Sequence, residues 1–457
     1  MFFATTNILP ILAAEEKELK QSEKDIIPSG PEPSKPIDSL EWNRTIPVKY
    51  NADVVVIGGG IAGVSAAAAA AKFGVKVILI ERFAVTGGML TTGGVASFCG
   101  SIDKQGEVFD EILSELTVWK AIKKNIFDHE ILAIVLQELL LRRGIKLLLH
   151  TRFVDVVQKD GRITECVLAG KSGVEAVRGK VFIDCTGEGD VARAAKYTTI
   201  KGRPEDGLQL PMSLMYFVRH VESNDAESQL PEGWFHPIKQ KENLPMTSIW
   251  SNGPRSNAIK IKIPMFDSTD TESLTAAEIQ ARRRMMEVHY YHQVVEKRPW
   301  KYDHCSPIIG IREGCRIVGD YVLTVDDLRA GRKFNDAVAR GTYYLDGHKP
   351  DDDKRTYILD KSQLKIPPYQ IPLRSLIAKD GKNLLMAGRC FSADQLALSS
   401  ARVSTSSSMM GQAVGITAAL ATISGQGVRE ISATEVRKIV EERGGSLDVT
   451  SNEKVWG

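Results

Sequence analysis

The stretch that most constrains the fold is DVVVIGGGIAGVSAAAAAAKFGVKVILIER, residues 53–82. Its first apolar run, residues 54–57, is typical of a buried parallel strand. The alanine-rich residues 61–73 favour a helix that ends near Gly74. A second apolar run, residues 75–80, predicts another buried strand. The order strand, helix, strand predicts a β-α-β unit and therefore an α/β fold.

Three glycines at the strand-to-helix turn occupy the positions of G-x-G-x-x-G. Gly58 allows the tight turn, Gly60 lets the backbone approach a pyrophosphate, and Gly63 lets helix and strand pack closely. The free N–H groups at the start of the helix, at Ile61 and Ala62, favour the negative charge of a phosphate. The turn is therefore predicted to bind a dinucleotide.

Glu81 ends the second strand. A carboxylate at this place accepts hydrogen bonds from a ribose 2′-hydroxyl. Because Glu81 would also repel a 2′-phosphate, the sequence disfavours NADP. The motif by itself leaves FAD and NAD open.

Composition excludes several classes of protein. The chain has 457 residues, of which 43% are hydrophobic and 25% charged, with a net charge of +2. This balance is ordinary for a globular protein and argues against nucleic acid as a partner. No apolar run is long enough for a membrane span. The six cysteines form no C-x-x-C motif, so we predict no zinc, iron–sulfur or other metal site.

The N-terminal stretch MFFATTNILPILAA has an apolar middle followed by small residues. It lacks the positively charged start of a signal peptide and a twin arginine, so we expect a cytoplasmic protein, with export as the alternative. Residues 1–45 are predicted to be an N-terminal segment and linker. A proline-containing stretch near its end suggests an arm across the surface.

The rest of the chain divides into segments that differ in composition. Residues 46–211 are expected to form the first part of a dinucleotide-binding domain. Residues 212–366 hold about half of the aromatic residues and six of the eight histidines, which predicts an inserted cap domain with a long helix over 274–297 capped by Thr275. Residues 367–425 resemble residues 46–211 in composition and are expected to be the return segment of the dinucleotide-binding domain. Residues 426–457 are predicted to be a helix, capped by Ser432, and a tail.

Seven motifs occur in the order found in one flavoprotein superfamily. They are DVVVIGGGIAGVSAA, ERFAVTGG, HTRFVDV, VFIDCTGEGDVA, IGIREGCRIVGDY, IPLRSLI and NLLMAGRCFSADQLALSSARV with MGQAVG after it. Over about residues 46–440 the chain resembles the FAD-dependent oxidoreductases of the glutathione-reductase-like superfamily, in particular the group that includes the flavoprotein subunit of heterodisulfide reductase. The motifs are specific for the family but not for a substrate.

The resemblance implies that the dinucleotide is FAD. It implies that Val154 contacts the adenine through its backbone and that a helix starting near Met410 directs its positive end at the flavin, where it would stabilise the charge of the reduced ring. The cofactor-binding residues that it implies are Gly58, Gly60, Ile61, Ala62, Gly63, Glu81, Arg82, Gly88, Val154, Thr186, Gly187, Asp190, Gly388, Arg389, Gly411, Gln412 and Gly415.

Three departures limit what the resemblance implies. Glutathione-reductase-type enzymes have a redox cysteine pair beside the flavin, whereas Cys99 stands alone in the corresponding region, so a thiol relay is not expected. The chain also lacks the cysteine clusters of heterodisulfide reductase. Where many relatives have HGSIRV, this chain has LSSARV over residues 398–403, so a role for that histidine cannot be transferred.

Candidate catalytic residues follow from what flavin chemistry asks of a protein, namely position, charge and proton transfer. Arg402 is a candidate for binding a substrate carboxylate or polarising a carbonyl, and an ordinary ion pair is its alternative. Arg312 is predicted to share a helical face with Arg316 and to line the same site, with a surface position or a pair with Glu313 as the alternative. His348 and His304 are candidate bases, with a purely structural role as the alternative for each, and Tyr369 is a further candidate.

Together these observations predict an α/β protein in which a three-layer Rossmann-like FAD-binding domain is interrupted by an α+β substrate-cap domain. The expected function is an FAD-dependent oxidoreductase that transfers a hydride between a small-molecule substrate and flavin N5. Two alternatives are an electron-transfer subunit that serves an electron-acceptor protein with iron–sulfur centres, and a non-catalytic FAD-binding protein.

Overall fold

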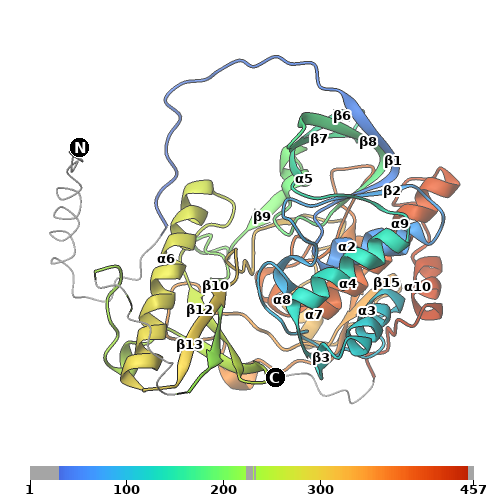
Figure 1. Ribbon diagram of the computed structural model, residues 1–457. Coiled ribbons are helices and arrows are strands. Elements are labelled where there is room, and N and C mark those ends of the chain that lie inside the picture. Colours follow the sequence, from blue (N-terminus) through green and yellow to red (C-terminus); the bar gives the residue numbers. More distant parts are fainter. Residues whose placement is uncertain (1–29, 223–229, 231–232, 451–457) are drawn as a thin grey trace.

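The computed structural model describes residues 30–222, 230 and 233–450. The apolar stretch at the N-terminus, residues 1–14, lies outside the described residues, as do residues 451–457. The described chain forms a larger α/β body and a smaller body around helix α6 (Thr271–Tyr290), which Figure 1 shows side by side.

The larger body is built on a parallel sheet whose central strand is β1 (Val48–Ile57). β1 pairs in parallel with β2 (Val77–Ile80) and with β8 (Gly173–Asp184). β5 (Lys146–Leu148) extends the sheet beyond β2, and β17 (Leu384–Met386) pairs with β8. The end of β1 and all of β2 are buried, which confirms the two apolar runs predicted as buried strands.

Helices cover one face of this sheet. Helix α2 (Ile61–Ala71) connects β1 to β2 as predicted, and helix α9 (Ser404–Ser424) packs against both α2 and β1. α9 begins well before the predicted start near Met410. Hydroxyl groups of its serine-rich first turns donate to backbone carbonyls, as from Thr405 Oγ1 to Cys99 and from Ser407 Oγ to Arg402.

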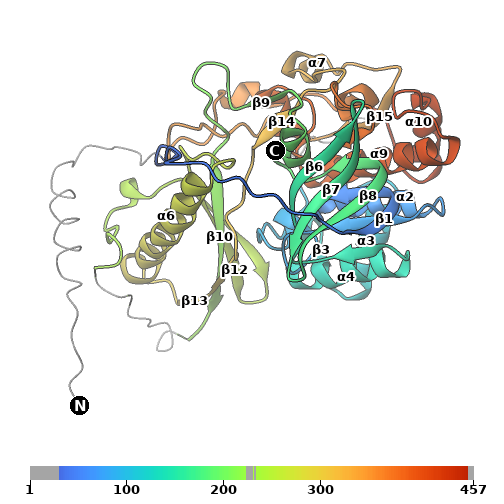
Figure 2. The same ribbon diagram turned by 90° about the horizontal axis from the view of Figure 1, so that it is seen from above.

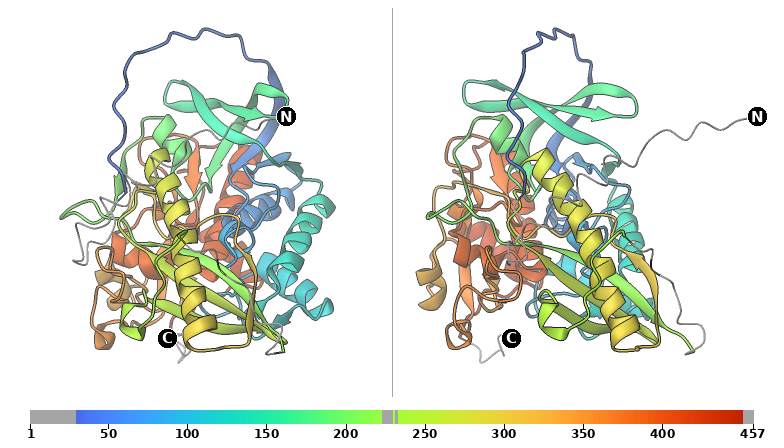
Figure 3. Two further views of the ribbon diagram at one scale, coloured as in Figure 1. Left: turned by 60° about the vertical axis from the view of Figure 1, so that its left-hand side comes forward. Right: turned by 90° about the vertical axis from the view of Figure 1, so that its left-hand side faces the viewer.

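An antiparallel ribbon forms the third layer. It consists of β6 (Arg152–Lys159), β7 (Arg162–Gly170) and the first half of β8, and it projects from the parallel sheet (Figure 3). Asp160 and Gly161 join β6 to β7 with φ of 53° and 74°. Two positive φ angles are those of a tight hairpin turn. The layers confirm the expected Rossmann-like α/β fold.

Shorter elements complete the larger body. Ser432 caps the last helix, as predicted, by accepting a hydrogen bond from Glu435 N at 3.4 Å. The elements are η1 (Gly88–Leu90), α3 (Glu107–Val118), β3 (Ile122–Lys123), β4 (Ile126–Phe127), α4 (His129–Arg142), α5 (Asp190–Ala194), β9 (Thr199–Lys201), β14 (Cys315–Ile317), α7 (Val325–Arg329), β15 (Ala337–Gly341), η5 (Lys361–Gln363), β16 (Tyr369–Pro372), η6 (Leu373–Leu376), α8 (Gln395–Ala401) and α10 (Ala433–Glu442).

The smaller body is an antiparallel sheet with helix α6 on one face (Figure 2). The strands are ordered β11 (Thr247–Gly253), β12 (Ser256–Ile263), β10 (Met212–His220) and β13 (Trp300–Cys305), and the short η3 (Lys241–Asn243) precedes β11.

The helix α6 begins earlier than predicted. Its cap is Asp270, whose side chain accepts from Ser273 N at 2.8 Å. The predicted cap, Thr275, lies inside the helix and donates to the Thr271 carbonyl instead. After Tyr290 the helix continues as a π-helical turn, η4 (Tyr291–Val295).

The second core is shorter in sequence than the predicted insertion of residues 212–366. Its buried apolar residues run from Met212 to Ile311. β14 then pairs with β9, and apolar residues from Ile317 onward belong to the core of the larger body. The second core therefore ends near residue 311, and the bounds of the inserted domain, residues 212–366, stay a prediction.

The N-terminal arm joins the two bodies across the surface. Gly30 N bonds to the Met265 carbonyl at 2.9 Å beside α6, and the exposed chain then crosses to β1 (Figures 1 and 2). This agrees with the surface arm predicted from the prolines. Over the described ranges of the chain, no helix is both long and apolar enough to cross a membrane.

Helices α2 and α9 touch through their backbones. A Cβ atom on Gly411 would lie well inside 3.0 Å of the Ala62 carbonyl oxygen, and one on Gly415 equally close to the Ala66 carbonyl oxygen. Across the same contact, the hydroxyls of Ser65 and Ser408 lie 2.7 Å apart. The small residues of both helices therefore serve this contact.

We predict that Gly411→Ala and Gly415→Ala each destabilise the protein by roughly 1–3 kcal/mol, because the added methyl group overpacks two rigid backbones. An alanine would otherwise favour the helix by about 1 kcal/mol, so the sign of the change tests the contact. Urea unfolding measures it. Gly427→Ala, where a Cβ would lie 3.6 Å from the Glu430 side chain, is the control and should change little. Increased stability in either helix variant would contradict the close contact.

Candidate functional site

A cavity of about 440 Å³ lies where the carboxyl ends of the parallel strands meet the smaller body. Ligands of open α/β sheets bind outside the carboxyl ends of their strands. Fourteen of the residues predicted from the sequence line this cavity: Gly58, Gly60, Ile61, Ala62, Glu81, Arg82, Gly88, Thr186, Gly187, Asp190, Arg312, Gly388, Arg389 and Arg402. Tertiary structure thus gathers segments that are far apart in the chain.

The glycine turn is shaped for a close approach by backbone and ligand. Gly58 has φ of 99°, and a Cβ there would collide with the Cys185 carbonyl. Gly63 lies against the Gly58 carbonyl with no room for a side chain. At Gly60, in contrast, a Cβ would meet no atom within 4 Å. Gly60 caps α2 without any side-chain hydrogen bond, so the first N–H groups of the helix are open to an anion.

Glu81 is 5% exposed and is held in place by two backbone amides. Its Oε2 accepts from Gly59 N at 2.7 Å, and its Oε1 accepts from Phe83 N at 2.9 Å. Burial raises the pKa of Glu81, and these amides act against that shift. Each carboxylate oxygen keeps a free lone pair, as a bond from a ribose hydroxyl requires.

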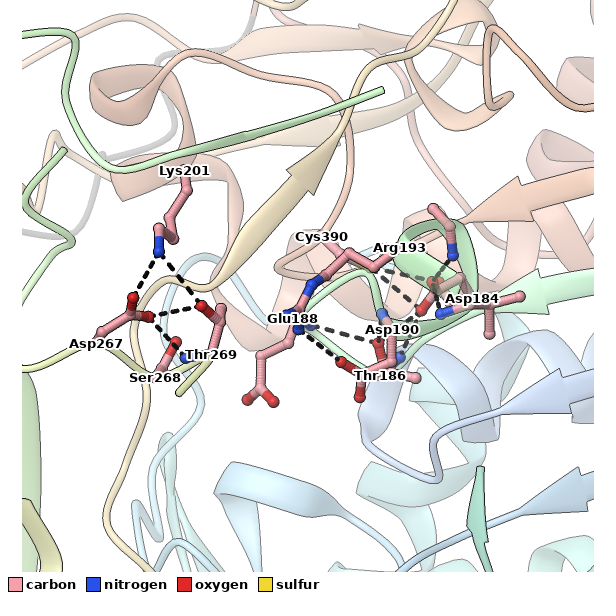
Figure 4. A network of polar contacts seen from close by, with 12 residues as sticks. Asp184, Thr186, Glu188, Asp190, Arg193, Lys201, Asp267, Ser268, Thr269 and Cys390 are labelled. Carbon is pink, nitrogen blue, oxygen red and sulfur yellow. Dashed lines mark hydrogen bonds and ion pairs between the residues drawn. The ribbon is translucent and has the colours of Figure 1, made fainter. Parts of the chain in front are cut away.

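The second loop of the cavity is organised by Asp184 at the end of β8 (Figure 4). One carboxylate oxygen accepts from the N–H and hydroxyl of Thr186, and the other from Val191 N at 3.0 Å. Thr186 Oγ1 in turn accepts from Asp190 N at 3.0 Å. Burial raises the pKa of Asp184 to about 6. Asp184 was not among the predicted site residues, although its place after a buried strand is a signal that could have found it.

Arg389 brings a buried positive charge to the same end of the cavity. Its Nη2 lies 3.3 Å from Glu188 Oε1, and Arg82 lies 3.6 Å from the other oxygen of Glu188. The buried Nε of Arg389 has no hydrogen-bond partner in the described part of the chain. A bare helix end, a ribose-type carboxylate and an unsatisfied guanidinium together fit a dinucleotide such as FAD.

Arg402 lies at the other end of the cavity as the C-cap of α8. Its Nη2 donates to Asp346 Oδ2 at 2.9 Å, while His348 Nε2 lies 3.1 Å from Asp346 Oδ1. Burial alone would raise the pKa of Asp346, but His348, Arg402 and Lys260 outweigh it and hold that pKa well below its usual range. The ion pair named as the alternative for Arg402 is therefore present, and Arg402 also lines the cavity.

The predicted base candidates do not line the cavity. His348 is 1% exposed and lies behind Asp346, and burial together with Arg312 lowers its pKa to about 3, so it is neutral at pH 7. His304 stacks on Phe217 with ring centroids 4.4 Å apart. The Tyr369 hydroxyl lies 2.7 Å from Ser400 Oγ inside the core. In sequence, a buried histidine looks the same whether or not it faces a ligand.

Arg312 and Arg316 do not share a helical face, because their segment is an irregular loop leading into β14. Arg312 lines the cavity, and its Nη1 donates to the Pro211 carbonyl at 2.7 Å and Ser213 Oγ at 2.6 Å. Arg316 pairs with Glu313 at 3.0 Å away from the cavity. Strand pairing of β14 with β9 overrides the spacing that suggested a helix.

Five predicted cofactor residues lie off the cavity. Gly63, Gly411 and Gly415 serve backbone contacts, as described above. Gln412 Oε1 accepts from Val108 N at 3.3 Å. Val154 is 51% exposed, and the preceding residue, Phe153, lines the cavity instead. The N-terminus of α9 does face the cavity, but through Val403 and Ser404, because the helix starts there. Binding by the predicted residues stays a prediction.

The smaller body contributes residues that the sequence did not single out. Trp250 of β11 and Lys260 of β12 line the cavity, with Tyr343, Tyr344 and Asp346 from the loop after β15. The run AIKIKI, residues 258–263, contained a signal, since alternation with isoleucine places Lys260 and Lys262 on one face of a strand. The isoleucines of this strand face the core of the smaller body, so the two lysines lie on the other face. Lysines that are not fully exposed there are unusual and indicate a function or a buried contact.

The fold and cavity define a class of dinucleotide-binding flavoproteins. The chain belongs to the FAD dependent oxidoreductase family, whose model matches residues 53–440. This confirms the resemblance drawn from the motifs and confirms FAD as the cofactor.

Relatives and solved structures extend the comparison. Thiamine thiazole synthase of Methanococcus aeolicus is 30% identical over 171 residues, which are 35% of this chain and 62% of that protein. A geranylgeranyl bacteriochlorophyll reductase-like protein of Thermoplasma acidophilum has a TM-score of 0.47 at 12% identity over 89% of this chain and 95% of the other. p-Nitrophenol 4-monooxygenase of Pseudomonas putida has a TM-score of 0.43 at 12% identity over 86% of this chain and 84% of the other.

We predict that Glu81→Ala weakens FAD binding by about 10- to 150-fold, because charge-assisted bonds to the ribose are worth roughly 1.5–3 kcal/mol. Fluorescence titration of the apoprotein with FAD measures the dissociation constant. Glu175→Ala removes a carboxylate that pairs with Lys49 on the antiparallel ribbon and should leave FAD affinity unchanged. An unchanged dissociation constant for Glu81→Ala would remove Glu81 from the site.

Proposed function

We propose that this FAD-dependent oxidoreductase transfers a hydride between a small organic substrate and N5 of the flavin. The observation that carries the proposal is the continuous cavity, which runs from the glycine turn to polar and aromatic side chains of the smaller body. Bound FAD supplies the hydride chemistry itself. The chain supplies binding, orientation and charge.

Arg402 is the residue with the clearest role at the substrate end. Asp346 holds its Nη2, whereas its buried Nε has no hydrogen-bond partner among the described residues. A guanidinium fixed in this way can bind a carboxylate or polarise a carbonyl group. His348 contacts Asp346 and not the cavity, so it acts as a positioning residue for this pair.

The free thiols at the cavity support direct transfer rather than a thiol relay. Cys99 and Cys185 both line the cavity, and both are free. Burial raises the pKa of each thiol, so both stay protonated at neutral pH. Because the thiolate is the reactive form, a relay through these cysteines is disfavoured.

We predict that a small organic reductant bleaches the flavin of the purified protein without any partner. The measurement is anaerobic titration with a panel of sugars, amino acids and 2-hydroxy acids, followed by flavin absorbance. Flavin that no small molecule reduces, but that a partner protein with iron–sulfur centres does, would replace this proposal by an electron-transfer role.

With a reductant in hand, we predict that Arg402→Lys slows flavin reduction by 10-fold or more, because an ammonium group cannot reproduce a two-pronged guanidinium contact. FAD content should not change. Arg316→Lys is the matched control: it alters another buried, ion-paired arginine that does not line the cavity. Stopped-flow reduction and flavin occupancy are measured for both. Wild-type reduction in Arg402→Lys would contradict a catalytic role.

A further inference from the structure

Positive charge collects at the substrate end of the cavity. Lys260 comes from β12 of the smaller body, Arg312 from the loop before β14, and Arg402 from the end of α8. One carboxylate, Asp346, lines the cavity beside them. These four groups are electrostatic neighbours of one another. Three cations facing one carboxylate leave an excess of positive charge.

Asp346 is already engaged and cannot neutralise the other two cations. One of its oxygens accepts from Arg402 at 2.9 Å, and the other lies 3.1 Å from His348 Nε2. The side chain of Lys260 is half-buried and makes no hydrogen bond or ion pair with any residue that the structure describes. Arg312 is 8% exposed and bonds through Nη1 to two neutral oxygens, of Pro211 and Ser213.

Buried cations without a counter-ion are costly, so proteins pair them or use them to bind anions. Because the side chains of Lys260 and Arg312 have no counter-ion of their own among the described residues, we propose that the substrate is a small organic anion. Its carboxylate or phosphoryl group would be held between Lys260 and Arg312. The inference rests on the proposed function, since it assigns the substrate class of that same cavity. Trp250, Tyr343 and Tyr344 line the same end and would contact the carbon skeleton of the substrate.

Lys260 and Arg312 differ in their neighbours from the cation at the glycine turn. The charged neighbours of Arg389, at the glycine-turn end, include Glu188, Arg82 and Arg402. Lys260 and Arg312 are not among them, and both are neighbours of Asp346 instead. Arg402 neighbours both sets, so the proposed anion site is assigned to Lys260 and Arg312.

The test uses the FAD-loaded protein and pairs of probes that differ in charge. The pairs are benzoate with benzamide, succinate with succinamide, and glycerol 3-phosphate with glycerol. Binding is read from the flavin difference spectrum and from tryptophan fluorescence, with Trp250→Phe to assign the fluorescence signal. We expect at least one anion to perturb both signals and its neutral partner to bind at least about 10-fold more weakly, as loss of a charge-assisted contact implies.

Lys260→Met removes one cation that makes no bond to the described protein, so this variant should fold. It should weaken the binding of the anion by about 10-fold or more and leave FAD affinity unchanged. Arg312→Met should act in the same direction. Lys262→Met is the matched control, since Lys262 lies on the same strand but bonds to the Arg355 carbonyl at 2.7 Å and does not line the cavity.

The pH dependence of anion affinity gives a further test, because a purely structural role of Lys260 would not change it. Burial, with Arg312 nearby, lowers the pKa of Lys260 to about 8, and Asp346 and Cys99 act in the opposite direction. Lys260 is therefore charged below pH 8 and loses its charge as the pH rises. Arg312 keeps its charge to higher pH, because its own pKa is about 10. Anion affinity should fall through pH 8 in the wild type and not in Lys260→Met.

Two results would overturn the inference. Neutral probes that bind as well as their anionic partners would show that the cations do not select the ligand. Loss of FAD from Lys260→Met and Arg312→Met, with Lys262→Met unaffected, would show that these cations serve the cofactor. Failure of the proposed function is seen separately, as flavin that no small molecule reduces even though an anion binds.

Discussion

The close approach of helix α2 to helix α9 is the contact on which the site depends. Gly411 and Gly415 of α9 lie against the carbonyl oxygens of Ala62 and Ala66, where no side chain fits. Because both helices begin at the carboxyl edge of the parallel sheet, this contact brings two helix N-termini to one cavity. Each N-terminus carries positive partial charge, so their meeting favours an electron-rich ligand between them. A larger residue at the contact would separate the two helix ends.

Hydrogen bonds to single carboxylates organise the loops around this cavity. Glu81 holds the glycine turn through Gly59 N, and Asp184 holds the second loop through Thr186. Asp346 does the same for Arg402 at the opposite end. In each case the acid bonds to protein groups first and is oriented before any ligand arrives. Such preorganisation lowers the cost of ordering the site when a ligand binds.

The two ends of the cavity differ in what they offer a ligand. The glycine-turn end presents the backbone amides at the start of α2 and the guanidinium of Arg389. The other end is completed by the smaller body, whose strands add Trp250 and Lys260, and by Arg312. The glycine turn and Glu81 of the first end belong to the motifs that identify the family, whereas Trp250 and Lys260 of the second end lie outside all of these motifs. The motifs therefore indicate the family but not the substrate.

The sequence by itself determined the β-α-β unit, its glycine turn and the place of Glu81, because these depend on local patterns of apolar residues and glycine. The choice of FAD over NAD came from the order of seven motifs along the chain, through their resemblance to a family, and the family model confirms it. The sequence also located the start of α10 at its Ser432 cap, but not the starts of α6 and α9. Tertiary structure alone decided that Arg312 faces the cavity while Arg316 pairs with Glu313, and that His348 lies behind Asp346. These outcomes depend on contacts between segments far apart in the chain, which spacing along the chain does not encode.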